Sequence, residues 1–395
     1  MSDTYTKTTT TSLGSRLGSS CVGVIIGIIL FFAAFPLIFW NEGRAIKRTK
    51  TLNEGQAVCV TVDPAAPEGD LEGDLEGKLV NFSGQVKTDE TLSDPLFSQT
   101  VSNALHFARK VEMYQWVEHQ KSETKKKTGG STETTTTYTY KKEWVDHPVD
   151  SSSFEKPEGH ENPAEWPVSG ERWQVGSASI GVFELSDKQI ERAGSEQPYK
   201  PFVTNNIPLP SGLDGSYSRI QEGFYRASSE GASIGSPKVG DLKISFEVTP
   251  VCAVSFAGAK VGNEIKSYQT KFGELLLQYD GDLNKEQIFA HAHRDNTILT
   301  WLLRIVGLLM FFFGLKLLVG PLNVLADIIP FIGNICDFIT GAAAFLIALV
   351  LTLVTVAVAW IAVRPVLGII LIVIAVALII FAKMSSKKQP AVRQQ

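Results

Sequence analysis

Two histidine-bearing segments are the first candidates for chemistry in this 395-residue sequence. His160 lies in the run Gly159-His160-Glu161-Asn162-Pro163, where no nucleophile or carboxylate partner is evident, so a structural hydrogen bond is favoured over catalysis. His291 and His293 are two positions apart, a spacing that suits a metal ion only on a strand. The sequence offers no third ligand near them, and we expect both to be exposed side chains.

A hydrolase-like motif occurs at Gly231-Ala232-Ser233-Ile234-Gly235. The nucleophile elbow of hydrolases requires a strand before the serine and a helix after it. No strand is predicted before this run, and Pro237 blocks the helix that should follow, so the match is interpreted as chance. The sequence also contains no glycine-rich phosphate loop.

The four cysteines include no CxxC pair and do not have the spacing of a zinc site. Cys59 and Cys252 lie in strand-like runs and could pair in an oxidising compartment, although two separate buried thiols are favoured. Cys21 and Cys336 fall in or beside apolar segments, where a thiol behaves as a small apolar group. The sequence therefore predicts no catalytic, cofactor-binding or metal-binding residue, and a protein that is not an enzyme.

Apolar residues are concentrated in two regions, residues 21–40 and 298–382, although the overall composition is ordinary. The formal net charge of -4 argues against nucleic acid as a partner, because phosphate binding needs a concentrated basic surface. The run of lysines at positions 125–127 is typical of a solvated loop tip.

Residues 21–40 predict the first transmembrane helix, because they carry no charge and as a helix would span about 30 Å. We expect this helix to be an uncleaved anchor, preceded by a disordered Thr/Ser-rich leader at residues 1–20. Gly23 and Gly27 form a GxxxG pair, which predicts self-association.

The C-terminal region predicts three more spans, at residues 300–319, 338–360 and 366–382. Residues 322–337 are too short and broken to cross, and predict an interfacial or re-entrant segment. Four charges accompany these helices, and the first two lie near span ends where they can reach the headgroups: Arg304, Lys316, Asp327 and Asp337.

Residues 49–296 predict a large β-rich α+β domain placed in the lumen or outside the cell, because the basic tail at residues 383–395 favours the cytosol or nucleoplasm. A hairpin is expected from the strand-like runs at residues 111–118 and 134–144, with turn residues at 127–130. Short helices are expected to begin at Asp94 and Asn284. Asn81, in an N-x-S tripeptide, is a possible glycosylation site.

Several stretches of the chain resemble the transmembrane protein 43 (LUMA) family, over nearly the whole length after the leader. Those stretches are Asn41-Glu42-Gly43-Arg44-Ala45, residues 76–80, residues 111–118, residues 159–163, residues 239–242, Thr300-Trp301 with Arg304 and Gly307, and Arg364-Pro365. The resemblance implies a four-span protein of the endoplasmic reticulum and inner nuclear membrane that self-associates, with lamins and emerin as partners. It implies no catalytic residue or cofactor, and a cell-envelope protein if the source is prokaryotic.

Three functions remain in competition. A non-enzymatic, oligomeric multi-pass scaffold that organises membrane protein complexes is favoured by the resemblance and by the GxxxG pair. A channel or transporter is the first alternative, because Asp327 and Asp337 lie beside a broken helix of the kind that lines transport pathways. A lipid-binding membrane organiser is the second.

Overall fold

The computed structural model describes residues 3–66, 75–199, 216–221 and 223–363, and the fourth span expected at residues 366–382 lies outside them. The chain divides into two compact units. Unit 1 comprises Met1–Thr9, Thr51–Thr124 and Thr134–Ala292, and is rich in strands. Unit 2 comprises Thr10–Lys50, Lys125–Glu133 and His293–Gln395, and its described part is largely helical.

The larger sheet of unit 1 is built around two long strands, β6 (Ala104–Lys126) and β7 (Thr132–Val145), which form the expected hairpin. Its order is β1-β7-β6-β14-β13-β12, with β11 against β14 and β8 against β6. The remaining bounds are β1 (Asp3–Thr11), β8 (Glu171–Gln174), β11 (Gln197–Pro198), β12 (Ser216–Ile220), β13 (Gly223–Ala227) and β14 (Leu242–Pro250).

A second sheet has the order β2-β3-β15-β16-β10-β9, with β19 against β15. Its strands are β2 (Val60–Thr61), β3 (Leu79–Gln85), β9 (Ser179–Ile180), β10 (Phe183–Glu184), β15 (Ala253–Val261), β16 (Glu264–Lys266) and β19 (Leu277–Asp280). Two strand pairs stand apart, β4 (Thr91–Asp94) with β5 (Gln99–Ser102) and β17 (Tyr268–Gln269) with β18 (Glu274–Leu275).

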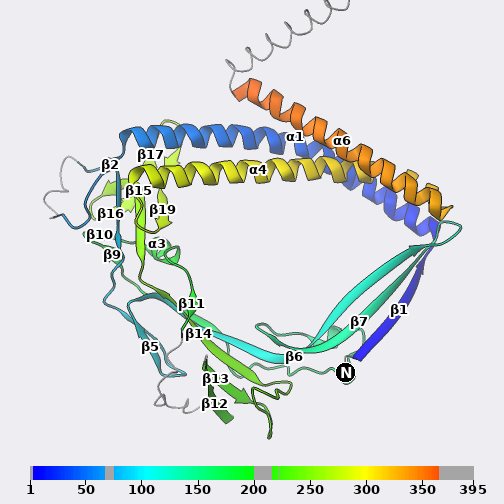
Figure 1. Cartoon of the computed structure of the whole chain (residues 1–395), viewed down its shortest axis with the longest axis horizontal. Coiled ribbons are helices and arrows are strands. Elements are labelled where there is room, and N and C mark those ends of the chain that lie inside the picture. The colour runs from blue at the N-terminus through cyan, green and yellow to red at the C-terminus, as the bar shows by residue number, and fades with distance from the viewer. Residues whose placement is uncertain (1–2, 67–74, 200–215, 222, 364–395) are drawn as a thin grey trace, which may run out of the picture. The chain divides into compact units, whose positions relative to one another are not determined.

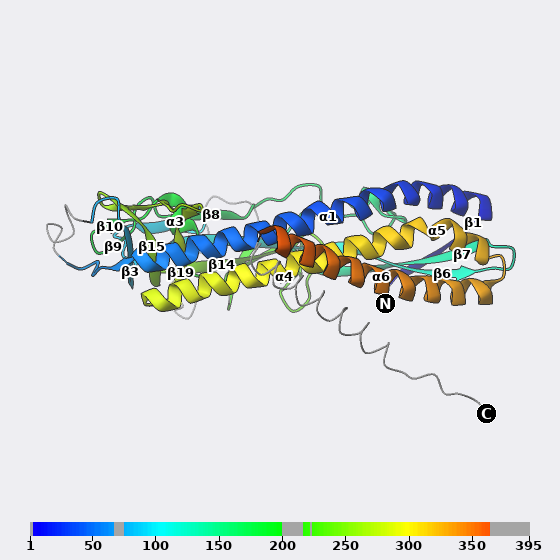
Figure 2. The same cartoon turned by 90° about the horizontal axis from the view of Figure 1, so that it is seen from above.

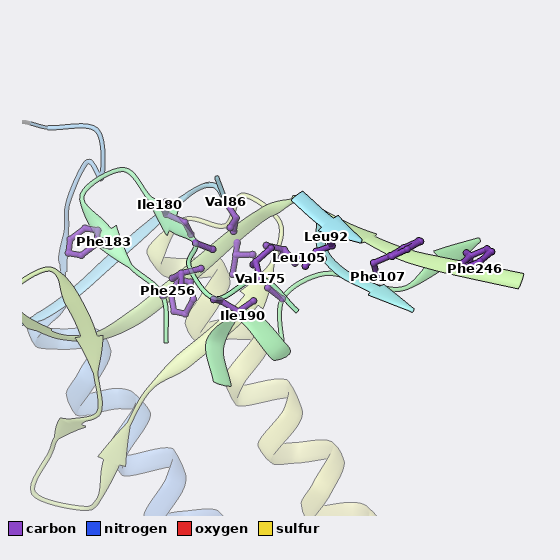
Figure 3. Close-up of a cluster of buried hydrophobic side chains, with 14 of the residues drawn as sticks. Val86, Leu92, Leu105, Phe107, Val175, Ile180, Phe183, Ile190, Phe246 and Phe256 are labelled. Atoms are coloured by element: carbon purple, nitrogen blue, oxygen red, sulfur yellow. The ribbon is translucent and has the colours of Figure 1, made fainter. Parts of the chain in front are cut away.

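The core of unit 1 is a cluster of buried aromatic and branched side chains from both sheets (Figure 3). Phe82 stacks on Phe183 with ring centroids 4.2 Å apart, and Phe107 stacks on Phe246 at 5.5 Å. Arg109 is also buried, with its guanidinium over the rings of Phe97 and Trp173. Its Nη1 donates to both carboxylate oxygens of Asp94 at 2.7 Å. Asp94 is therefore the last residue of β4 and the ion-pair partner of Arg109. The prediction that a short helix begins at Asp94 is wrong.

The N-terminal residues form strand β1, whereas the sequence predicted a disordered leader. Threonine and tyrosine favour strands because their side chains pack well on a pleated surface, and the Thr-rich strand β7 provides the neighbour that such a strand needs. The expected cap at Asn284 is confirmed. Its side chain accepts a hydrogen bond from the backbone N–H of Gln287 at 2.9 Å, and the Gln287 side chain accepts one from the Asn284 N–H at 3.0 Å.

Among the residues that the structure describes, three helices are long and apolar enough to cross a membrane: α1 (Leu13–Val58), α4 (Lys285–Leu318) and α6 (Pro330–Val363). Within unit 2, α1 and α4 lie side by side in both views (Figures 1 and 2). Shorter helices are η1 (Ser151–Ser153), α3 (Asp187–Glu191) and α5 (Gly320–Ala326). Pro330 starts α6, so residues 330–337 are the first turns of the helix that continues through residues 338–360.

Candidate functional site

The three long helices of unit 2 are connected by one buried carboxylate, that of Glu42 in α1. Arg304 in α4 donates to it from Nε at 2.7 Å and from Nη2 at 2.9 Å, each nitrogen reaching a different oxygen. The indole N–H of Trp360 in α6 donates to Oε2 at 2.8 Å. Because Glu42 is only 2% exposed, this carboxylate is satisfied entirely by side chains of the two neighbouring helices.

The geometry at Glu42 suits arginine and no other cation. A planar guanidinium matches a carboxylate with two parallel hydrogen bonds, whereas a lysine ammonium provides a single point of charge. The Arg304 guanidinium also lies 4.8 Å from the ring centroid of Trp301 and 5.9 Å from that of Trp360. Removing one member of such a pair leaves an uncompensated buried charge, which typically costs about 3–5 kcal/mol.

A second set of polar contacts joins α1 and α4 through residues on either side of Glu42 in α1. Arg44 donates to the side chain of Asn296 at 3.0 Å and to the hydroxyl of Thr300 at 3.0 Å. Asn41 donates to the backbone carbonyl of Thr300 at 3.0 Å, and Asn296 donates to the carbonyl of Ala45 at 3.0 Å. These hydrogen bonds fix the register of α1 against α4, in addition to the ion pair between Glu42 and Arg304.

The spacing of these residues explains why they meet. Asn296, Thr300 and Arg304 recur every four positions, which places them on one face of α4. On α1, Asn41 and Arg44 are three positions apart and therefore also share a face. Asn41, Arg44, Thr300 and Arg304 are among the positions by which the sequence resembles the transmembrane protein 43 family, so two stretches far apart in the chain form one site.

Glycines allow α1 and α4 to approach closely at the other end of the pair. A Cβ atom on Gly27 would lie 2.8 Å from the carbonyl oxygen of Gly314, and one on Gly314 would lie 3.0 Å from that of Gly27. Gly23 faces Leu317 of the same chain. The predicted self-association through Gly23 and Gly27 is not supported, because the close approach that the pair permits is made within the chain.

Arg304 was expected to extend to the headgroups, and that expectation is wrong because Glu42 pairs with it inside the helical unit. Glu42, Asn296 and Trp360 were not predicted from the sequence as members of this site. A signal was available, since a carboxylate directly after an uncharged apolar run requires a partner. Lys316 is exposed, and its approach to headgroups stays a prediction.

A second ionic cluster gathers at the junction of α5 and α6. Asp327 is 2% exposed and pairs with Arg16 of α1 and with Lys126 of the hairpin tip, the latter at 2.6 Å. Lys126 also pairs with Asp337. The cluster therefore combines two cations with two carboxylates, and it uses both of the acidic residues that the sequence had placed near the membrane.

In unit 1, His160 has the structural role expected of it. Its ring stacks on Tyr140 with centroids 4.0 Å apart and contacts Trp116 edge-on at 4.7 Å. The ring Nδ1 lies 3.0 Å from the carbonyl of Lys156 and Nε2 lies 3.4 Å from Asp3. Burial raises the pKa of the neighbouring Tyr140 to about 12, and its hydrogen bond to Glu118 acts in the same direction.

The expected glycosylation of Asn81 is contradicted by its burial. Asn81 is 1% exposed in β3, and its amide nitrogen donates to the carbonyl of Phe256 at 2.9 Å. A glycan on that buried nitrogen has no space to leave the sheet. Ser233 lies in a turn bridged to Ser236, which is not a strand-to-helix elbow.

All four cysteines are free thiols, so Cys59 and Cys252 are separate as favoured, although only Cys59 is buried and Cys252 is partly exposed. Burial raises the pKa of the Cys59 thiol to about 11, which keeps it protonated and unreactive near neutral pH. Among the described residues no group of three or more His, Cys, Asp or Glu side chains is arranged to hold a metal ion.

Fold and site together define a membrane-embedded protein with a large strand-rich unit, whose apolar helices are joined by a buried ion pair. The family model described as Transmembrane protein 43 matches residues 113–365. Transmembrane protein 43 of Rattus norvegicus and that of Homo sapiens are each 32% identical to the chain, over 80% of its length and 78% of theirs. The Transmembrane protein 43 homolog of Drosophila melanogaster is 31% identical, over 77% of the chain and 78% of its own length. The chain belongs to the transmembrane protein 43 family. No solved structure matches it.

Proposed function

We propose that the protein is a non-enzymatic membrane scaffold, which organises protein complexes at the endoplasmic reticulum and inner nuclear membrane, or in the cell envelope if its source is prokaryotic. The observation that carries this proposal is the internal neutralisation of the helical unit. Glu42 pairs with Arg304, and Asp327 pairs with Arg16 and Lys126. Charges that are paired inside the protein stabilise a membrane anchor, whereas a transport pathway needs charges that face water. The family is not a known enzyme family.

Unit 1 offers a surface that suits a protein partner. A groove of about 680 Å³ is lined by side chains of β6, β7 and β14 together with Tyr199. It presents the large aromatic rings that are enriched at protein interfaces, beside charged side chains of both signs: Lys110, Glu112, Glu143, Trp144, Tyr199 and Lys243. Lamins, emerin and a second copy of the chain are the partners that we propose for a eukaryotic source.

The test reverses the two cations of this groove in the full-length protein. We expect the double variant Lys110→Glu/Lys243→Glu to lose envelope proteins that the wild type retains during purification from native membranes. The matched control is Lys188→Glu, an exposed charge reversal on α3 outside the groove. Retention of the same proteins by all three, or a wild-type particle that is strictly monomeric and binds no envelope protein, would refute the proposal.

A lipid-binding role is the second candidate, favoured by a groove of about 520 Å³ between α1 and α6. Its lining is almost wholly apolar: Phe35, Pro36, Phe39, Val354, Thr355 and Val358. Such a lining fits an acyl chain. A photoactivatable phospholipid should therefore label this part of α1, and the substitution Val354→Trp should reduce that labelling. Unchanged labelling of the variant would remove this candidate.

A further inference from the structure

The ion pair between Glu42 and Arg304 is enclosed on its acidic side and open on its basic side. The Glu42 carboxylate is buried, whereas 16% of the Arg304 side chain is exposed. Nε and Nη2 of Arg304 donate to Glu42, and within the part of the chain that the structure describes the third nitrogen, Nη1, has no hydrogen-bond partner. Nη1 can therefore donate to an anion without breaking the existing pair.

The charges at this site are not balanced. The hydrogen bonds of Arg44 go to neutral side-chain oxygens of α1 and α4, so Arg44 and Arg304 have only the carboxylate of Glu42 between them. Residues 364–395 cannot supply another carboxylate, because their sequence contains no Asp or Glu. The three groups therefore carry one net positive charge, and a bound anion would compensate it.

Tryptophan rings mark the depth of this site in a bilayer. The ring centroids of Trp301 and Trp360 lie 4.8 Å and 5.9 Å from the Arg304 guanidinium, and Trp40 precedes Glu42 by two residues. Trp40 and Trp301 are each more than half exposed. Because indole rings are enriched at the level of the lipid headgroups, the open side of Arg304 lies near phospholipid phosphates. The side chain meets them without leaving its ion pair.

The apolar groove between α1 and α6 leads to this site. Phe35 and Phe39 line the groove, and Glu42 follows them on the same face of α1 because the three residues are four and three positions apart. Glu42 is about 4.5 Å beyond Phe39 along the helix axis. The Arg304 guanidinium reaches across to Glu42 and to the ring of Trp360, on the two helices that form the groove. An apolar channel of about 520 Å³ therefore ends beside an open cation.

We propose that the groove and Arg304 form one phospholipid site, with an acyl chain in the groove and the phosphate bound by Nη1 of Arg304. The inference rests on the lipid-binding candidate for this groove and adds recognition of the headgroup phosphate to it. Charge complementarity selects this occupant. An apolar helix from a partner would fill the groove but leave Arg304 without an anion, and a free phosphate would leave the groove empty.

A competition experiment on the full-length wild type in detergent tests the site. The probe is phosphatidylglycerol with a photoactivatable group on one acyl chain, and we expect mass spectrometry to find the label at residues 35–39 and 354–358. Unlabelled phosphatidylglycerol should reduce this labelling at a concentration about ten-fold lower than diacylglycerol with the same chains, because only the phospholipid can accept a charge-assisted hydrogen bond.

The outcomes separate the two parts of the proposal. Equal competition by phosphatidylglycerol and diacylglycerol would overturn phosphate recognition and leave the lipid-binding candidate in place. Absence of label from both segments would overturn both. Competition by glycerol 3-phosphate as strong as that by phosphatidylglycerol would indicate a site for free phosphate, and would also overturn the inference.

Variants assign the two parts to their residues. Val354→Trp should fill the groove and lower the labelling, whereas Val350→Trp, one turn earlier on α6 at an exposed residue outside the groove, should not. The double variant Glu42→Leu/Arg304→Leu should still be labelled but should lose the preference for phosphatidylglycerol over diacylglycerol. A preference that survives in this variant would show that the phosphate is bound elsewhere. If the double variant does not fold, the wild-type competition still decides the question.

Discussion

The Arg304 guanidinium donates hydrogen bonds to both carboxylate oxygens of Glu42, although the two residues are 262 positions apart in the chain. One is at the end of an apolar run in α1 and the other is near the middle of α4, and Trp360 of α6 completes the contact. The Glu42 carboxylate is thus the point at which α1, α4 and α6 are joined by hydrogen bonds.

Glu42→Gln should destabilise the helical unit by about 3–5 kcal/mol, because it leaves the Arg304 guanidinium buried without its counter-charge. The double variant Glu42→Leu/Arg304→Leu should cost much less than the sum of the two single changes, since no unpaired charge then remains. Thermal unfolding of the full-length protein in detergent measures both. Additive losses would show that the two side chains act separately, and the exposed Lys316→Gln should change little.

Gly27→Ala should loosen the contact between α1 and α4, because the added Cβ would lie 2.8 Å from the carbonyl oxygen of Gly314. Overpacking of this kind costs about 1–3 kcal/mol. Gly18→Ala in the same helix has no heavy atom within 4 Å of the new Cβ, so it should be neutral or should stabilise the helix by up to about 1 kcal/mol. Equal effects of the two substitutions on the unfolding temperature would contradict the packing described for Gly27.

Asn81→Gln should leave the electrophoretic mobility of the protein from a eukaryotic host unchanged, since the buried amide carries no glycan. It should nevertheless reduce stability by about 1–3 kcal/mol, because the longer side chain cannot keep the hydrogen bond to Phe256 and leaves a buried carbonyl without its donor. Glycosidase treatment and thermal unfolding check the two statements. A glycosidase-sensitive band that disappears in the variant would refute the first.

The stability of unit 1 should fall in acid through Asp241. Burial alone would raise the pKa of this carboxyl group, but hydrogen bonds from Tyr225, from the N–H of Lys238 and from Ser228 together outweigh burial and leave the pKa below 3.8. A carboxyl group with a lowered pKa in the folded state contributes stability above its unfolded pKa, and that stability is lost as the pH falls through the folded value.

Asp241→Asn should therefore have a lower free energy of unfolding than the wild type at neutral pH. That free energy should also fall less between pH 5 and pH 3, a window set by the usual aspartate pKa of about 3.9. Thermal unfolding followed by tryptophan fluorescence across this pH range measures the difference. Parallel pH profiles for the two proteins would show that Asp241 is not responsible. Tyr225→Phe, which removes one of the donors, should lie between them.

Features with local causes could be predicted from the sequence. The hairpin of β6 and β7 follows from alternating β-forming residues around a glycine turn, and the start of α4 follows from the cap at Asn284. The apolar stretches likewise indicate α1, α4 and α6, because hydrophobicity over a helix length needs no knowledge of neighbours.

Features that depend on distant partners could not be predicted. Nothing near Glu42 indicates Arg304, and burial of Asn81 follows only from the pairing of β3 with β15. Strand β1 is the clearest case, since a Thr-rich run reads as disordered until β7 supplies its neighbour. Asp94 was misinterpreted for the same reason, because its partner Arg109 lies on another strand.

Strand β1 is synthesised before α1, and its partner β7 is completed long after α1 has left the ribosome. During that interval the Thr-rich edge has no strand beside it, and an unpaired edge is a template for pairing with another chain. Biogenesis therefore depends on the order of two events, delivery of α1 to lipid and closure of the sheet. A chain whose synthesis stops before β7 would present both an apolar helix and an open strand, which makes truncated products of this protein candidates for aggregation and rapid degradation.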